Sequence, residues 1–133
     1  MKEYYKEYTY KRDNRLSFII DCNGNVAYAY LLKDEDIVSD VWLYNVEETP
    51  EVINWEDKHS MPFLNPKNYT RNDKKISDIK DLDEVSLEWE CLQNEVTVTA
   101  YFNNSLKVIL KLGTSPGWSN NVFKDGPLAK VLI

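Results

Sequence analysis

The sequence predicts a mainly β protein with about six antiparallel strands in two three-stranded meanders. Apolar and polar residues alternate with a period of two in several segments, and turn-forming pairs separate those segments. A long connection over residues 46–83 divides the segments into two groups. An α+β fold stays open, because one or two short helices are expected in that connection and at the C-terminus.

The alternation is clearest over residues 84–112, which predict the second meander. Glu84, Ser86, Glu88 and Glu90 form a polar row, so this sheet would have one wet face. Leu92–Asn94 and Asn103-Asn104 would form the turns, since Asn tolerates the positive φ of tight hairpins. The residues expected to face the core are Val85, Leu87, Trp89, Cys91, Val96, Val98, Ala100, Phe102, Leu106, Val108, Leu110 and Leu112.

The first meander is predicted from three segments, Leu16–Asp21, Asn25–Lys33 and Asp36–Asn45. The Asn23-Gly24 pair is the strongest short hairpin signal in the chain, and a second turn is expected at Asp34-Glu35. The run VAYAYLL is apolar on both faces, which favours a strand in the middle of a sheet. The two meanders would form either one six-stranded sheet or two packed sheets.

The remaining segments allow more than one structure. A short helix is expected around Ser77–Leu82, and the closing PLAKVLI predicts a short helix or a final strand because Pro127 suits a first helical position. Residues 1–14 could form a helix, an edge element or a mobile arm. The length predicts one domain over residues 1–133.

The composition disfavours several classes of partner. The net charge is −6 and the isoelectric point about 4.8, so a nucleic-acid backbone or an anionic membrane would be repelled. The start has no apolar run typical of a signal peptide, and the default expectation is a cytoplasmic protein. Cys22 and Cys91 lie far apart with no metal-ligand spacing, and we expect two free, mostly structural thiols.

Catalytic signatures are weak. His59 is the sole histidine and lies in a proline-bounded segment, where a solvated side chain is more common than a general base. Glu88 and Glu90 share a strand face about 7 Å apart, within the range of paired glycosidase carboxylates. A row of acids on a wet face more often serves solubility. We therefore expect no enzyme activity, no cofactor and no metal.

The distribution of charge is more informative. The 24 residues Asp34–Asp57 contain no Lys or Arg but hold two tryptophans, Trp42 and Trp55. If these acids converge, they form a negative field that speeds association with a basic partner, and an exposed Trp could anchor it. For Trp42 we favour a core position. The partner-binding residues predicted from charge are Asp34, Glu35, Asp36, Asp40, Glu47, Glu48, Glu51, Trp55, Glu56 and Asp57.

Two segments resemble bacterial immunity proteins of polymorphic-toxin systems. The first is NGNVAYAYLLKDEDIVSDVWLYN (Asn23–Asn45) and the second is GTSPGWSNNVFKDGPLAKVL (Gly113–Leu132); DVWLYN, PGWS and KDGPLA are their most distinctive words. The resemblance implies a small cytoplasmic protein that binds and neutralises a cognate toxin domain, often a nuclease, without enzyme activity or cofactor. An acidic inhibitor could occupy the basic cleft of such a nuclease.

Two other readings remain open. A small β ligand-binding module of the carbohydrate type could use exposed aromatics, with Tyr4, Tyr5, Tyr8, Tyr10 and either Trp55 or Trp118 as a stacking platform. A structural or adaptor subunit would instead associate through the apolar first meander. The sequence leaves the oligomeric state open.

Overall fold

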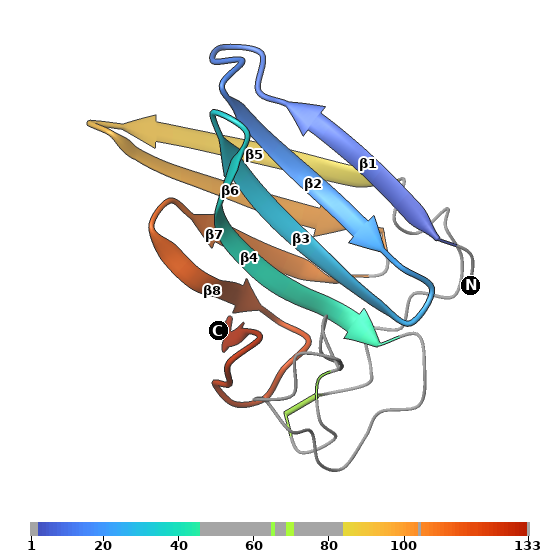
Figure 1. Ribbon diagram of the computed structural model, residues 1–133. Coiled ribbons are helices and arrows are strands. Elements are labelled where there is room, and N and C mark those ends of the chain that lie inside the picture. Colours follow the sequence, from blue (N-terminus) through green and yellow to red (C-terminus); the bar gives the residue numbers. More distant parts are fainter. Residues whose placement is uncertain (1–2, 46–64, 66–68, 71–83, 104, 133) are drawn as a thin grey trace.

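The computed structural model describes residues 3–45, 65, 69–70, 84–103 and 105–132. These residues form nine strands and no helix, so none of them belongs to a helix long and apolar enough to cross a membrane. The strands are β1 (Tyr4–Thr9), β2 (Leu16–Cys22), β3 (Val26–Lys33), β4 (Asp36–Asn45), β5 (Val85–Leu92), β6 (Glu95–Phe102), β7 (Lys107–Lys111), β8 (Thr114–Ser119) and β9 (Lys130–Val131) (Figure 1).

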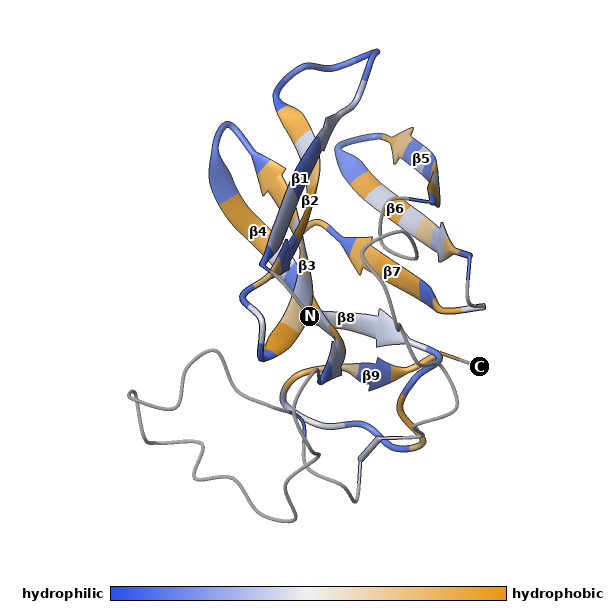
Figure 2. Ribbon diagram, turned by 90° about the vertical axis from the view of Figure 1, so that its right-hand side faces the viewer, coloured by the Kyte–Doolittle hydropathy of each residue, from blue (hydrophilic) through white to orange (hydrophobic). Residues whose placement is uncertain are grey.

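The strands make two sheets that form two layers (Figure 2). The first sheet has the order β1-β2-β3-β4 and is antiparallel throughout. The second has the order β5-β6-β7-β8-β9, and its last pair, β8 with β9, is parallel. Between the two alternatives that the sequence allowed, the two-sheet arrangement is the one observed.

Tight turns set the register of the hairpins. Asp34 and Glu35 have φ of 51° and 71°, and Gln93 and Asn94 have φ of 48° and 72°. Positive φ at both central residues is the mark of a type I′ turn, whose twist matches that of the strands. At the predicted Asn23-Gly24 hairpin, the Asn23 Oδ1 accepts hydrogen bonds from the backbone N–H groups two and three residues later, at 2.9 and 3.0 Å.

Several expectations were wrong. The strand count is nine instead of about six. The edge strand β1 and the final strand β9 were alternatives left open for their segments, whereas β8 was not predicted. The expected C-terminal helix is absent; Lys130–Val131 pair with β8 instead. The Asn103-Asn104 turn is longer than expected, since β7 begins at Lys107 and the positive φ, 72°, falls on Ser105. The helix expected around Ser77–Leu82 lies outside the described residues.

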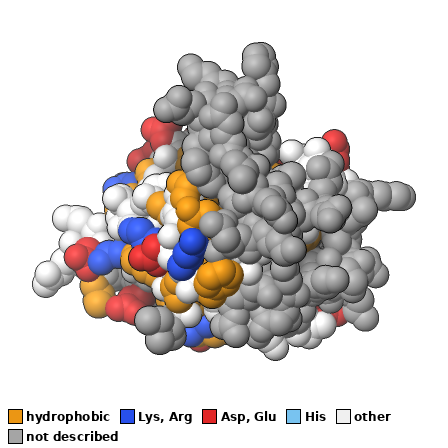
Figure 3. Space-filling model, turned by 90° about the horizontal axis from the view of Figure 1, so that it is seen from below, with side chains coloured by type: hydrophobic (Ala, Val, Ile, Leu, Met, Phe, Trp, Pro, Cys, Tyr) orange, Lys and Arg blue, Asp and Glu red, His pale blue; other side chains and the backbone are white. Residues whose placement is uncertain are grey.

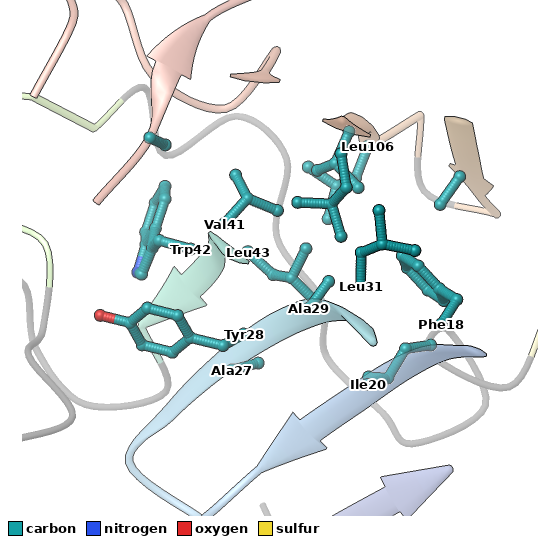
Figure 4. Close-up of a cluster of buried hydrophobic side chains, with 14 of the residues drawn as sticks. Phe18, Ile20, Ala27, Tyr28, Ala29, Leu31, Val41, Trp42, Leu43 and Leu106 are labelled. Carbon is teal, nitrogen blue, oxygen red and sulfur yellow. The ribbon is translucent and has the colours of Figure 1, made fainter. Parts of the chain in front are cut away.

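The core lies between the two sheets. Phe18, Ala29, Leu31, Val41 and Leu43 of the first sheet point toward it (Figure 4). The inward residues of β6 and the following strand are buried as predicted: Val96, Val98, Ala100, Phe102, Leu106, Val108 and Leu110. The inward row of β5 is different, because Val85, Leu87 and Trp89 are only half-buried and Cys91 is exposed. Cys91 is therefore not the core thiol that the alternation predicted.

The two sheets join along one side, where the free edge of β4 meets β8 and the segment 120–129. The Gly113 N–H donates to the Val38 carbonyl at 3.3 Å, and the Trp42 N–H donates to the Leu128 carbonyl at 3.0 Å. The Asn121 side chain donates to the Leu43 carbonyl at 3.0 Å. We call this the β4/β8 seam. Backbone groups of the edge of β4 are thereby satisfied by the second sheet and the segment that follows it.

The opposite side, between β1 and β5, is held more loosely. Tyr10, in the loop after β1, stacks on Trp89 of β5 with ring centroids 4.8 Å apart and an interplanar angle of 21°. Both rings are half-buried. This stack is the aromatic contact by which the described residues bridge the open side.

Candidate functional site

The described acids of the stretch Asp34–Asp57 lie at two separate places in the structure. Asp34 and Glu35 form the turn between β3 and β4, and Asp36 begins β4; all three are exposed. Ile37 follows them and is 61% exposed. We call these four residues the hairpin tip. The tip therefore presents carboxylates around one large apolar side chain.

The hairpin tip is not an uncompensated negative site. The Asp34 N–H donates to the Arg15 carbonyl at 2.9 Å, which places the loop after β1 beside the turn. The Arg15 guanidinium lies on Asp13 with contacts of 2.8 and 3.0 Å, and this pairing lowers the pKa of Asp13 to about 2. Lys33 lies opposite Asp36 in the strand register, so a second base is close to the tip. The stretch Asp34–Asp57 contains no base, but bases from other parts of the chain lie near its acids in the structure.

Between the hairpin tip and the first two strands lies an open groove. Its walls come from β1, the following loop, β2 and the turn, and they include Glu7, Thr9, Arg15, Ser17, Leu32 and Glu35. Acidic, basic and hydroxyl groups all contribute to its lining. Such a lining suits a polar segment of a protein partner better than an apolar small molecule.

Asp40 lies apart from the hairpin tip, on the outer face of the first sheet. It accepts a hydrogen bond from the Ser115 hydroxyl of β8, so this carboxylate belongs to the β4/β8 seam. Tyr28 and Tyr30 lie beside it and are nearly parallel, with centroids 6.2 Å apart. Burial, with Asp21 and Asp40 nearby, raises the pKa of Tyr30 to about 12.

Neighbouring groups on this outer face are also perturbed. Burial raises the pKa of Tyr28 well above its usual range, with smaller contributions from Tyr30 and Asp40. Burial and the nearby carboxylate of Glu3 raise the pKa of Asp21. In each case burial disfavours the charged form. The face is therefore a packed polar-aromatic layer in which Asp40 has a structural role.

Trp42 is buried, with 1% of its surface exposed, as favoured from the sequence. It lies beside Tyr28 (Figure 4). Its indole N–H donates to the Asn45 Oδ1 at 2.8 Å. A partner cannot use this ring as an anchor without unfolding the end of β4.

The remaining predicted contact residues lie outside the described part of the chain. These are Glu47, Glu48, Glu51, Trp55, Glu56 and Asp57, and His59 lies outside it as well. The predicted site is thus placed for four of its ten residues: three gather at the hairpin tip, and Asp40 does not. Ile37 was missed, because its position in a strand of mixed pattern gave no sign of its exposure.

The acids of the second meander lie on another surface. Glu88 and Glu90 are exposed on β5 and are paired with Thr99 and Thr97 of β6. Among the described residues, no group of three or more His, Cys, Asp or Glu side chains is arranged to hold a metal ion. At the end of the molecule where β9 lies, described side chains of both charges and hydrophobic ones are interspersed (Figure 3).

The tyrosines of the first strand do not share one face. Tyr4 and Tyr8 are half-buried and pack against the core, whereas Tyr5, the next residue after Tyr4, points to the other side and is 63% exposed. Trp118 lies on β8 of the other sheet, with the Lys130 ammonium 5.2 Å from its ring centroid. Tyr4, Tyr5, Tyr8 and Trp118 therefore do not form one aromatic platform, and the version of this alternative that uses Trp55 lies outside the described residues.

The words that carry the resemblance meet in space. DVWLYN forms the second half of β4, PGWS lies in β8, and KDGPLA covers residues 124–129. All three meet at the β4/β8 seam, where the carbonyl of Leu128 accepts from Trp42 and Asp40 binds Ser115. Two segments about 70 residues apart in the chain thus form one structural unit.

Comparison of the chain with protein-family models, with curated proteins and with solved structures gave no match. The resemblance to immunity proteins therefore rests on the quoted words alone.

Proposed function

We propose that this chain is an immunity protein that binds and neutralises a cognate toxin domain in the cytoplasm of the bacterium that makes both. The resemblance of the two segments at the β4/β8 seam supports the class. The observation that carries the proposal is the hairpin tip, where three exposed carboxylates directly precede an exposed Ile37. Stable interfaces combine an apolar centre with a polar, charged rim. No enzyme activity and no cofactor are part of the proposal.

The chemistry of the tip favours a basic partner. The Arg15 guanidinium is engaged with Asp13, and the carboxylates of Asp34, Glu35 and Asp36 are all exposed. Nucleases that grip a phosphate backbone present clusters of Lys and Arg, to which such carboxylates are complementary. Charge of this kind increases the association rate, whereas the buried apolar contact sets the lifetime of the complex.

The test begins with capture of the tagged protein from its own cells, first at low and then at high salt. Polypeptides that are retained at low salt are then produced alone, and their effect on growth is measured. The proposal predicts that one of them is basic, stops growth, and is rendered harmless when this protein is produced with it. A toxic polypeptide whose binding is insensitive to salt would contradict the electrostatic part of the proposal.

A variant pair locates the contact. Glu35→Lys with Asp36→Lys should slow association with the captured toxin at least tenfold at low salt. Glu3→Lys with Glu95→Lys changes the net charge by the same amount at exposed sites away from the tip and should have a much smaller effect. Equal slowing by both pairs would mean that only net charge matters and that the tip is not the contact.

A further inference from the structure

The edge strand β5 is a second candidate interaction surface, separate from the hairpin tip. Its eight residues pair with β6 in an unbroken register, without a bulge, from Val85 opposite Phe102 to Leu92 opposite Glu95. Among the described residues, β6 is the only strand that pairs with it. The strand contains no proline. It lacks the bulges and prolines by which many edge strands are protected from pairing.

The register shows which backbone groups face outward. The two-residue turn at Gln93-Asn94 closes on Leu92 and Glu95, which is a hydrogen-bonded pair in a type I′ hairpin. Hydrogen-bonded and non-hydrogen-bonded pairs alternate from there. The N–H and C=O groups of Trp89, Leu87 and Val85 therefore point away from β6, toward the edge.

The side chains define what could pair there. Leu87 and Trp89 pack against the core but stay half-buried, so the core is incompletely covered along this edge. Glu88 and Glu90 are exposed on the other face of the same strand. An added strand would place alternate residues beside each set: apolar ones beside Leu87 and Trp89, and others beside the two glutamates.

The glutamates also decide against a second copy of this chain. Two β5 strands paired edge to edge with their core faces aligned would set Glu88 and Glu90 opposite glutamates or Ser86. Like charges directly opposite each other destabilise a strand pair, whereas opposite charges stabilise it. Pairing of β5 with β5 of a second copy is therefore disfavoured. A partner strand that carries Lys or Arg at every second position is favoured.

We propose that β5 binds an extended segment of another protein in which basic residues alternate with apolar residues, added as a sixth strand to the second sheet. The segment's backbone pairs with the outward groups of Val85, Leu87 and Trp89. Its apolar side chains cover the half-buried row, and its basic side chains pair with Glu88 and Glu90. This proposal does not depend on the toxin-binding proposal.

The probe is a synthetic peptide of the length of β5 that alternates Lys and Val, compared with one that alternates Glu and Val. Binding is followed by amide NMR of the full chain. The Lys peptide should bind at least tenfold more tightly than the Glu peptide, and the amides of Leu87 and Trp89 should shift and gain at least tenfold protection from exchange. Equal binding of the two peptides, or protection confined to other strands, would overturn the proposal.

A charge-reversed variant supplies the matched control. Glu88→Lys with Glu90→Lys changes exposed side chains only, and it should exchange the preference so that the Glu peptide binds more tightly. Glu35→Lys with Asp36→Lys at the hairpin tip should leave peptide binding unchanged. A reversed variant that folds, as judged by its amide spectrum, but still prefers the Lys peptide would contradict the role of the glutamates.

Two N-methylated peptides separate strand addition from simple charge attraction. Methylation of every Val amide removes the donors that face β5 in an antiparallel pairing, and methylation of every Lys amide removes those of a parallel pairing. One of the two should lose at least tenfold in affinity, and its identity gives the orientation. A Lys peptide that tolerates both modifications would show that no strand is added.

Discussion

The two sheets meet in opposite ways along their two sides. At the β4/β8 seam, backbone and side-chain hydrogen bonds cross from one sheet to the other, and Trp42 beside them is 1% exposed. Between β1 and β5, the described contact is the stack of Tyr10 on Trp89, and the inward row of β5 is half-buried. One side is closed by polar pairing and the other is left partly open.

This difference separates the parts of the chain that determine the fold from the parts available to partners. The distinctive sequence words lie at the closed seam. Beside it, Gly117 allows β8 to approach Ile109 of β7, and Asn121 makes a buried hydrogen bond to Leu43 across it. The exposed edge of β5 and the hairpin tip carry the carboxylates that can attract a partner. Substitutions on the closed side should therefore change stability, and those on the open surfaces should change binding.

The largest effect on stability is expected for Gly117→Ala, where β8 packs closely on β7 beside the seam. An added Cβ would lie 2.4 Å from the Ile109 carbonyl oxygen and 2.7 Å from the Leu110 Cδ2, and the backbone atom cannot move aside cheaply. We expect a loss of about 3 kcal/mol in the free energy of unfolding, measured with denaturant. Gly113→Ala meets no atom within 4 Å but has a φ of +81°, and should cost only about 1 kcal/mol. Equal losses would argue against close packing between β8 and β7.

A smaller loss is expected for Asn121→Ala, at the seam itself. The Asn121 side chain is 3% exposed and donates to the Leu43 carbonyl, which would lose this partner. We expect the free energy of unfolding to fall by about 2 kcal/mol. The effect should be measured by urea unfolding beside Phe123→Ala, a change at a 55% exposed side chain nearby in the chain, which should have little effect. An Asn121 variant as stable as the parent would mean that the hydrogen bond does not hold the seam.

On the open side, the interaction between Tyr10 and Trp89 should stabilise the fold less than the contacts of the seam do. A double-mutant cycle of Tyr10→Ala and Trp89→Ala measures the interaction between the two rings, which we expect to be about 1 kcal/mol. Each single variant should still fold, because both rings are half-buried. A coupling as large as the loss for Asn121→Ala would show that the two sides of the molecule are held equally.

The smallest effect concerns alkaline pH and the tyrosines beside the seam. The pKa of Tyr30 is raised to about 12, and that of Tyr28 is raised as well, so the folded state keeps protons that the unfolded state loses. Stability is therefore fully present below pH 10 and should fall as pH rises from about 10 toward 12. Tyr30→Phe should reduce this slope in unfolding curves measured across that range. An unchanged slope would mean that Tyr30 is ionised equally in both states.

The hairpins could be predicted from the sequence because their signals are local. Asn23-Gly24 and Asp34-Glu35 form turns at the expected places, and the alternation of Val96, Val98 and Ala100 gives their burial correctly. The strand β8 was missed because Pro116 and Gly117 look like breakers, whereas Gly117 allows a close approach to Ile109.

The candidate site was harder to predict because it depends on pairing over long distances. Arg15 reaches the hairpin tip through the order of the first sheet, which no local pattern shows. Cys91 follows the alternation of β5, but it lies near the end of an edge strand and stays exposed. In the sequence, Ile37 is an ordinary apolar residue of a strand, and only the structure shows that it is exposed and available for contact.

Growth rescue tests most directly whether this chain neutralises a toxin through its hairpin tip. Cells that produce the captured toxin are given the parent chain, the tip variant Glu35→Lys/Asp36→Lys, or the control variant Glu3→Lys/Glu95→Lys, at equal levels of folded protein. We expect the parent and the control variant to restore growth, and the tip variant to show a clear loss of rescue. Capture that yields no toxic polypeptide at either salt, or a tip variant that rescues as well as the parent, would contradict this expectation.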